Sequence, residues 1–225
     1  MPPELKRISE SAFAPSHDDV LLELAGAKNY NEWLFGRAAP YLGTHVLDVG
    51  AGIGTFTELA LEHGASVTAL EPDTPFADYL RGRFDPAVPV EVVEADLMEF
   101  DRPGAFDSII CFNVLEHVRD DAAAVRHFRE LLAPNGRLLL LVPAHRWLSS
   151  PFDAAVGHER RYEKGELREL LIAGGVATDV VRYVNPVGAL GWLVSMRLRR
   201  RAKLPTGQLR VFDRIVPAIR VLDRL

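Results

Sequence analysis

The sequence predicts a doubly wound α/β fold with a mainly parallel sheet, and three features point to it. Five short runs of β-branched or aliphatic residues alternate with amphipathic stretches, which is typical of parallel strands joined by helical crossovers. Several runs are almost continuously apolar, as expected for strands covered on both faces. A glycine-rich segment at 50–54 follows the first run and precedes a helical pattern. Ligand loops of such sheets lie at that place.

The N-terminal segment predicts a helix that begins near Ser16 and extends to about Tyr41, because a capping hydroxyl precedes an acidic residue near the positive end of the helix. Residues 134–136, Pro-Asn-Gly, give a turn signal between a helix that ends near Leu132 and the fifth strand. The five expected strands lie at 46–49, 66–70, 90–93, 106–112 and 137–142.

The chain beyond the fifth strand predicts a different succession of elements. A polar, aromatic loop leads to a helix at 164–173 that ends at two glycines. Residues 177–184 predict a sixth strand. The segments 187–201 and 208–225 predict two amphipathic or basic helices.

We expect two parts in the chain: residues 1–185, with the core at 43–185, and a C-terminal extension at 186–225. The two parts differ in net charge. The chain has a net charge of −5, yet the extension holds nine basic residues and two acidic ones, so the remainder carries about −12. Because residues 1–185 are this acidic, we do not expect a nucleic-acid partner. The extension is expected to be a lid or a surface-docking element.

Composition indicates an ordinary globular protein. Of the 225 residues, 48% are hydrophobic and 25% are charged, which excludes a disordered or low-complexity chain. The single cysteine, Cys111, lies in an apolar run and has no partner for an intramolecular disulfide, so we expect a reducing compartment. No apolar run is long enough for a leader or a membrane span, and we expect a cytoplasmic location.

The glycine segment carries the first chemical information. Asp48 is followed by Gly50, Gly52 and Gly54, so the third glycine comes one residue too early for a dinucleotide-binding loop. A carboxylate at the mouth of the loop repels a pyrophosphate and favours a ligand with positive charge. The pattern therefore predicts a cationic ligand and disfavours a nicotinamide dehydrogenase.

Two further acidic residues follow the next two strands. Glu71 ends the second strand, where an acid accepts hydrogen bonds from both hydroxyls of a ribose. Asp96 follows the third strand and is placed to accept from an adenine amino group, with Leu97 against the ring. Together with Asp48, they predict a site for an adenosine that also carries an ammonium group.

These motifs, in this order, resemble those of class I S-adenosylmethionine-dependent methyltransferases. The resemblance implies a Rossmann-like methyltransferase fold, S-adenosyl-L-methionine as cofactor and S-adenosyl-L-homocysteine as product. The matching segments are 46–56, 70–73, 94–97, 112–118 and 131–141. The cofactor-binding residues implied are Tyr30, Asp48, Gly50, Gly52, Gly54, Glu71, Pro72, Asp96, Leu97 and Asn113.

The sequence departs from that family at its end, because the usual antiparallel seventh strand is apparently missing. The sheet edge and the oligomeric state therefore stay open.

The loop after the fifth strand is the expected place of the acceptor substrate. His145 or His158 would act there as a general base or position the acceptor, since an imidazole titrates near neutral pH. A polar network that fastens the loop, with Arg161 paired to Asp153, is an equal alternative. The substrate-binding candidates are His117, Trp147, Arg161 and Tyr162, and no metal ligands are predicted.

Three functions remain open at this point. The first is in-line methyl transfer to a small-molecule acceptor. The second keeps this chemistry but places the acceptor on a lipid-linked or cell-surface glycan precursor, with peripheral membrane contact through the basic helices. The third is a non-catalytic S-adenosylmethionine-binding protein.

Overall fold

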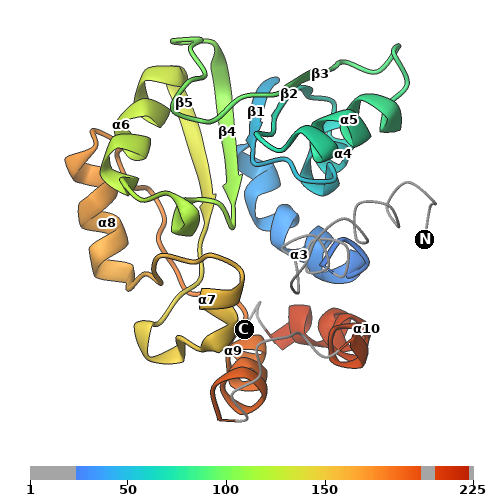
Figure 1. Cartoon of the computed structure of the whole chain (residues 1–225), viewed down its shortest axis with the longest axis vertical. Coiled ribbons are helices and arrows are strands. Elements are labelled where there is room, and N and C mark those ends of the chain that lie inside the picture. Colours follow the sequence, from blue (N-terminus) through green and yellow to red (C-terminus); the bar gives the residue numbers. More distant parts are fainter. Residues whose placement is uncertain (1–23, 199–205, 223–225) are drawn as a thin grey trace.

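The computed structural model describes residues 24–198 and 206–222. Its centre is a five-stranded sheet in which every described pairing is parallel, with the strand order β3-β2-β1-β4-β5 (Figure 1). The predicted doubly wound α/β class is confirmed. The strands are β1 (His45–Val49), β2 (Ser66–Leu70), β3 (Val90–Val93), β4 (Phe106–Phe112) and β5 (Leu132–Leu141).

Helices cover both faces of the sheet (Figure 1). One face packs on α3 and α4 through a core that includes Val46 and Ile110, and the other packs on α6 and α8 through a core that includes Leu47 and Ile109. Adjacent strand residues thus enter opposite cores, as the two-residue period of a strand requires. The helices are α3 (Lys28–Ala38), α4 (Thr55–Glu62), α5 (Thr74–Arg83), α6 (Asp121–Leu131) and α8 (Lys164–Ala173).

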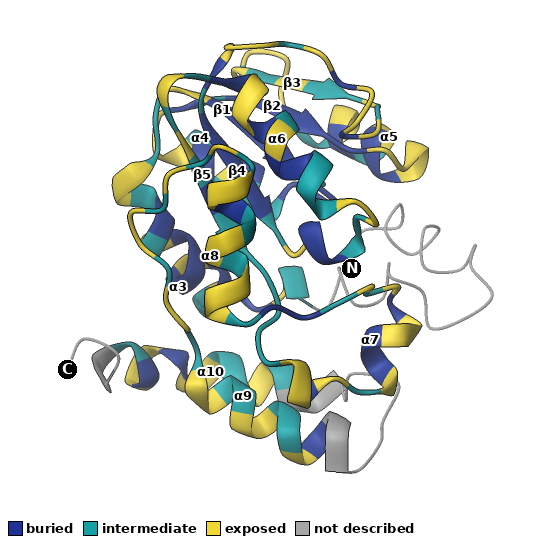
Figure 2. Cartoon of the chain, turned by 90° about the vertical axis from the view of Figure 1, so that its left-hand side faces the viewer, coloured by how far each residue is buried: buried dark blue, intermediate teal, exposed yellow. Residues whose placement is uncertain are grey.

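The C-terminal helices form a separate layer at one end of the molecule (Figures 1 and 2). Helix α9 (Pro186–Trp192) continues into a π-helical turn (Leu193–Leu198), and α10 (Thr206–Leu222) packs on α3, where Val216 and Ile219 are buried. The carboxylate of Asp213 accepts hydrogen bonds from the backbone N–H of Tyr30 (2.9 Å) and from the Asn29 amide (3.0 Å). The two predicted C-terminal helices are confirmed.

Other predicted boundaries hold in part. The single helix predicted from Ser16 to Tyr41 is interrupted at residues 26–27, directly before α3 begins. Helix α3 leads into a 3₁₀ turn that ends at Tyr41, as predicted, whereas the cap expected at Ser16 lies outside the described residues. Residues 134–136 do not separate helix from strand but lie inside β5 as an irregularity, where Asn135 has φ 64°. Strand β5 therefore begins directly after α6.

The sixth strand predicted at 177–184 is wrong, because this segment has no strand structure. The hydroxyl of Tyr183 donates to Glu163 Oε2 (3.0 Å) and accepts from the backbone N–H of Lys164 (3.1 Å). These bonds hold the segment against the start of α8. In the described part of the chain no antiparallel strand completes the sheet, in agreement with the prediction that the seventh strand is missing.

None of the described helices combines the length and the apolar character that crossing a membrane requires.

Candidate active site

The loop after β1 requires its glycines. Gly50, Gly52 and Gly54 have φ values of 65°, 55° and 81°, in the left-handed region that favours glycine. A methyl group added to Gly50 would lie 2.5 Å from Cγ2 of Val114, the residue that follows Asn113 at the end of β4. The loop therefore turns sharply into α4 and lies directly against the segment after β4.

Asp48 is buried at the end of β1, 3% exposed, and accepts a hydrogen bond of 2.6 Å from the hydroxyl of Thr57. Burial, assisted by the negative charge of Glu71, raises the pKa of Asp48 to about 7, although the Thr57 hydrogen bond acts against this. A nearby positive ligand would favour the ionised form.

Substitution of Asp48 should change how stability depends on pH. A carboxyl group with a pKa of about 4 in the unfolded chain and about 7 in the folded one favours the folded state most below pH 4. That contribution, at most roughly 4 kcal/mol, is lost as the pH rises to 7. Relative to the wild type, Asp48→Asn should therefore gain stability between pH 4 and 8. Urea unfolding at each pH measures this difference, and a difference that stays constant with pH contradicts the assignment.

Glu71 is also buried and fastens the glycine loop to the end of β2. Its Oε2 accepts from the backbone N–H of Gly52 (2.7 Å) and its Oε1 from that of Asp73 (3.0 Å). Burial raises the pKa of Glu71, whereas these two hydrogen bonds lower it. A carboxylate accepts about four hydrogen bonds, so capacity for ribose hydroxyls remains.

The other predicted cofactor residues differ in exposure. Asp96 is exposed and its Oδ1 accepts from the backbone N–H of Met98 (2.8 Å), whereas Leu97 is buried in the core. Pro72 is exposed. Asn113 is exposed at the end of β4, has φ 56°, and donates its backbone N–H to Leu141 (2.8 Å).

Tyr30 belongs to α3 and its side chain contacts α10. Its ring meets that of Phe212 edge to face, with centroids 5.6 Å apart, and lies 6.1 Å from that of Trp33. Burial raises the pKa of Tyr30 and a hydrogen bond with Asn185 lowers it. Tyr30 therefore joins the sheet domain to the C-terminal layer.

The loop between β5 and α8 is held by a buried network. The Nε of Arg161 donates to Asp153 Oδ1 (2.8 Å) and its Nη1 donates to the carbonyl of Ala144 (3.1 Å). The indole of Trp192 lies 4.8 Å from the Arg161 guanidinium. The hydroxyl of Tyr162 donates to Asp121 (2.9 Å). The alternative prediction of a fastening network with an Arg161–Asp153 pair is confirmed.

The two predicted histidines of this loop have separate surroundings. His145 stacks on Tyr183, with centroids 4.4 Å apart, and its Nδ1 lies 3.4 Å from Glu163 Oε2. The nearby Trp147 is half exposed. The Nδ1 of His158 instead lies 3.0 Å from Asp153 Oδ1.

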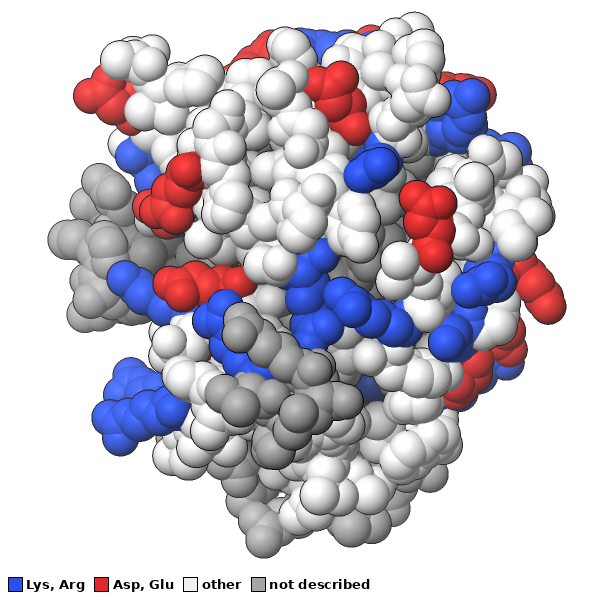
Figure 3. Space-filling model, turned by 180° about the vertical axis from the view of Figure 1, so that it is seen from behind, with Lys and Arg blue, Asp and Glu red and all other residues white. Residues whose placement is uncertain are grey.

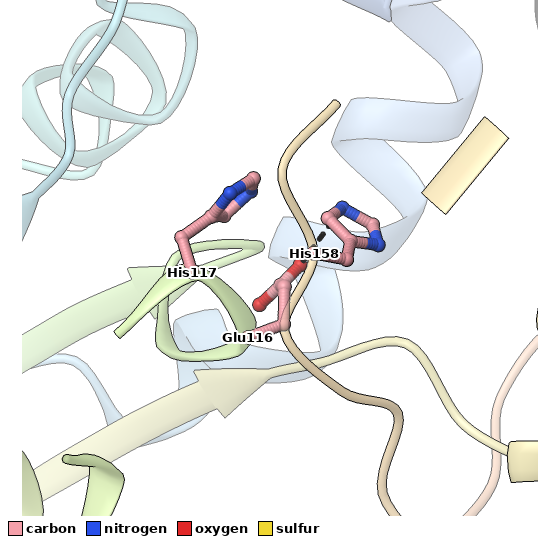
Figure 4. A group of neighbouring side chains, drawn as sticks. All are labelled: Glu116, His117 and His158. Carbon is pink, nitrogen blue, oxygen red and sulfur yellow. Dashed lines mark ion pairs between the residues drawn. The ribbon is translucent and has the colours of Figure 1, made fainter. Parts of the chain in front are cut away.

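His158 belongs to a cluster with Glu116 and His117, which we call the Glu-His-His cluster (Figure 4). One nitrogen or oxygen atom from each residue lies within 4.8 Å of the other two. Glu116 and His117 come from the 3₁₀ turn after β4 (Leu115–His117), and His158 comes from the loop after α7 (Pro151–Ala155). The imidazole rings of His117 and His158 are nearly perpendicular, 4.8 Å apart.

Glu116 is the residue that sequence reasoning missed. It is fully buried, and neither carboxylate oxygen has a hydrogen-bond partner among the described residues. Burial raises its pKa to about 8. Burial raises the pKa of Cys111 in β4, and the charges of Glu116 and Asp48 raise it further.

Comparison with known proteins assigns the family. Residues 47–138 match the family model described as a methyltransferase domain. A ubiquinone biosynthesis O-methyltransferase of Ralstonia nicotianae is 31% identical over 170 residues, which cover 70% of this chain and 68% of that protein. The chain belongs to the class I S-adenosylmethionine-dependent methyltransferases. The enzyme of the same name from Pseudomonas aeruginosa is 34% identical over 134 residues, which cover 58% of this chain. Our chain spans about half of its length, 54%.

Solved methyltransferases share the fold. An S-adenosylmethionine-dependent methyltransferase from Mesorhizobium loti matches with a TM-score of 0.58 and 24% identity, over 71% of this methyltransferase and 87% of that chain. The 1,6-didemethyltoxoflavin-N1-methyltransferase of Burkholderia thailandensis, solved with S-adenosylhomocysteine, matches with a TM-score of 0.54 and 26% identity, over 73% and 72% of the chains.

The residues of this methyltransferase fit the cofactor of its family, S-adenosylmethionine. Asp48 and Glu71 are buried carboxylates beside a glycine loop, whose sharp turn depends on the positive φ values of its three glycines. Such a donor set suits a ligand with positive charge and ribose hydroxyls, and not a pyrophosphate.

Proposed function

We propose that this methyltransferase transfers the methyl group of S-adenosylmethionine to a hydroxyl oxygen of a small-molecule acceptor. The observation that carries the proposal is the Glu-His-His cluster, which begins two residues after Val114, the residue packed against Gly50 of the glycine loop. Removal of a hydroxyl proton needs such groups, and an unprotonated amine does not. The relatives named O-methyltransferases support oxygen as the methylated atom.

The cofactor supplies an activated methyl group: the acceptor oxygen bonds to the methyl carbon while the carbon–sulfur bond breaks and its electron pair stays on sulfur. The protein's own work is to hold the acceptor in line with that bond, and such positioning supplies about 7–11 kcal/mol. We assign activation of the acceptor hydroxyl to the Glu-His-His cluster. His145, stacked on Tyr183, is assigned to positioning of the loop.

Replacement of His158 tests this function. His158→Gln should lower turnover of a hydroxyl acceptor by about 10²–10⁴-fold, while the dissociation constant of S-adenosylmethionine, measured by calorimetry, stays unchanged. His145→Gln is the matched control and should change turnover only a few-fold. S-adenosylhomocysteine formation with panels of phenols, catechols and amines gives the readout. Cofactor binding without methyl transfer to any hydroxyl acceptor would support the non-catalytic alternative.

A second candidate acceptor is a lipid-linked or cell-surface glycan precursor at a membrane surface. Apolar side chains are exposed on the C-terminal layer, and Arg210 and Arg214 are exposed beside two of them. Figure 3 shows Lys and Arg side chains across the middle of the back of the molecule, with some Asp and Glu side chains among them. The basic side chains would favour an anionic surface. The exposed apolar residues are Val187, Leu190, Val194, Val211 and Ile215.

Liposome sedimentation separates the two acceptors. The full chain with Leu190→Asp and Val211→Asp should bind anionic vesicles less than the wild type does if the acceptor is membrane-linked. Equal binding of both proteins removes this second candidate.

A further inference from the structure

We propose that the Glu-His-His cluster binds one divalent transition-metal ion, which holds and activates the hydroxyl of the acceptor. The inference rests on the proposed function only for the role of the ion, and not for its binding. Three observations carry it: the buried carboxylate of Glu116 without a hydrogen-bond partner among the described residues, the orientation of His158, and the chemistry of the three ligands.

The carboxylate of Glu116 is the first. It is fully buried, and neither oxygen has a hydrogen-bond partner among the described residues. Buried carboxylates are normally paired, hydrogen-bonded or bound to a metal, because burial of an uncompensated charge is costly. The nearby Arg161 gives its hydrogen bonds to Asp153 and Ala144 instead. A cation between Glu116 and the two histidines would supply the missing partner.

The orientation of His158 is the second. Its Nδ1 is 3.0 Å from Asp153 Oδ1, which selects the tautomer with the proton on Nδ1. The Nε2 lone pair is then free, and this nitrogen lies 3.9 Å from Glu116 Oε1. Asp153 is itself fixed by Arg161 (2.8 Å) and by the hydroxyl of Ser150 (2.9 Å). A carboxylate that orients a ligating histidine is the usual outer partner of a metal site.

The loop geometry places His158 against His117. Gly157 has φ 80°, and a methyl group on it would lie 3.8 Å from His117 Nδ1. The three candidate ligand atoms lie within 4.8 Å of one another. Ligands at about 2.1 Å from a tetrahedral ion are about 3.4 Å apart, so side-chain rotation would close the cluster around the ion.

The ligand set is the third observation. Two imidazoles and one carboxylate suit Zn²⁺, Fe²⁺, Co²⁺ or Ni²⁺ better than Mg²⁺ or Ca²⁺, which prefer oxygen. Three protein ligands leave a position open, as in catalytic sites. An acceptor hydroxyl bound there loses its proton to water more readily, and the resulting oxygen attacks the methyl carbon. The methyl carbon–sulfur bond breaks with its electron pair left on sulfur, so charge and atoms balance.

Direct metal binding tests the site. The full chain is stripped with a chelator and titrated with Co²⁺ and Zn²⁺, without acceptor, by calorimetry and visible absorption. We expect one equivalent of Co²⁺ with an absorption band of low-symmetry coordination. Glu116→Gln, His117→Gln and His158→Gln should each weaken binding at least 100-fold, and Asp153→Asn about 10–100-fold. His45→Gln, an exposed histidine at the start of β1, is the matched control and should bind as the wild type does.

Several results would overturn the inference. The site is ruled out if the wild type binds less than one equivalent of metal. It is also ruled out if His117→Gln and His158→Gln bind the metal as strongly as the wild type does. Circular dichroism shows whether Glu116→Gln folds. If it does not, His117→Gln still tests the site, because His117 is partly exposed and its replacement should leave the fold intact. Full methyl transfer by stripped, metal-free protein disproves the role of the ion and leaves the proposed function intact. One bound metal ion without methyl transfer to any acceptor has the opposite meaning: the site stands and the proposed function fails.

Discussion

Gly50→Ala is expected to lower the affinity for S-adenosylmethionine by at least about 100-fold. Two effects combine at this position. The φ of 65° costs any residue with a Cβ about 1 kcal/mol. The added methyl group would also lie 2.5 Å from Cγ2 of Val114, so the glycine loop or the segment after β4 must move. Because that shift displaces the loop beside Asp48 and Glu71, we expect it to appear mainly in cofactor binding, measured by calorimetry.

Gly64→Ala is the matched control for Gly50→Ala. Gly64 has φ 83°, so the backbone cost is similar, but nothing lies within 4 Å of the added methyl group. This variant should lose about 1 kcal/mol of stability and retain cofactor affinity. Equal affinity of the two variants would show that the glycine loop does not form the cofactor site.

The sequence predicts features that depend on neighbouring residues. The apolar runs place β1, β2 and β4 closely because a strand buried on both faces needs apolar side chains throughout, and the β-branched run at 90–93 places the edge strand β3. The glycine spacing places the sharp turn at 50–54 because left-handed backbone excludes most other residues. Both signals are local, and both are confirmed.

Features that depend on distant contacts were wrong or missed. The segment 177–184 has the composition of a strand, but hydrogen bonds of Tyr183 to the start of α8 hold it elsewhere. Glu116 follows an apolar segment like many surface acids, and its burial depends on the loop around residue 158, where the N–H of Glu159 donates to its carbonyl (2.9 Å). In the sequence, the adjacent Glu116 and His117 are only a weak signal of a functional site. The third member, His158, lies 41 positions later and is brought next to them only by the fold.

Arg161→Met is expected to destabilise the protein by about 3–5 kcal/mol, the largest stability effect we predict. Arg161 and Asp153 are 8% and 4% exposed, so removal of the guanidinium leaves a buried carboxylate with less compensation. The substitution also removes the bond to the Ala144 carbonyl and the contact with Trp192. Thermal unfolding should show a midpoint lowered by roughly 6–20 °C.

Two comparisons identify the cause of that loss. Arg102→Met breaks an exposed ion pair with Glu91 and should cost less than about 1 kcal/mol. The double variant Asp153→Asn with Arg161→Met should recover part of the stability, because position 153 then no longer carries a charge that lacks its partner. Additive losses in the double variant would mean that Arg161 acts through its packing on Trp192 and not through its charge. The Arg161–Asp153 pair would then orient His158 without supporting the fold.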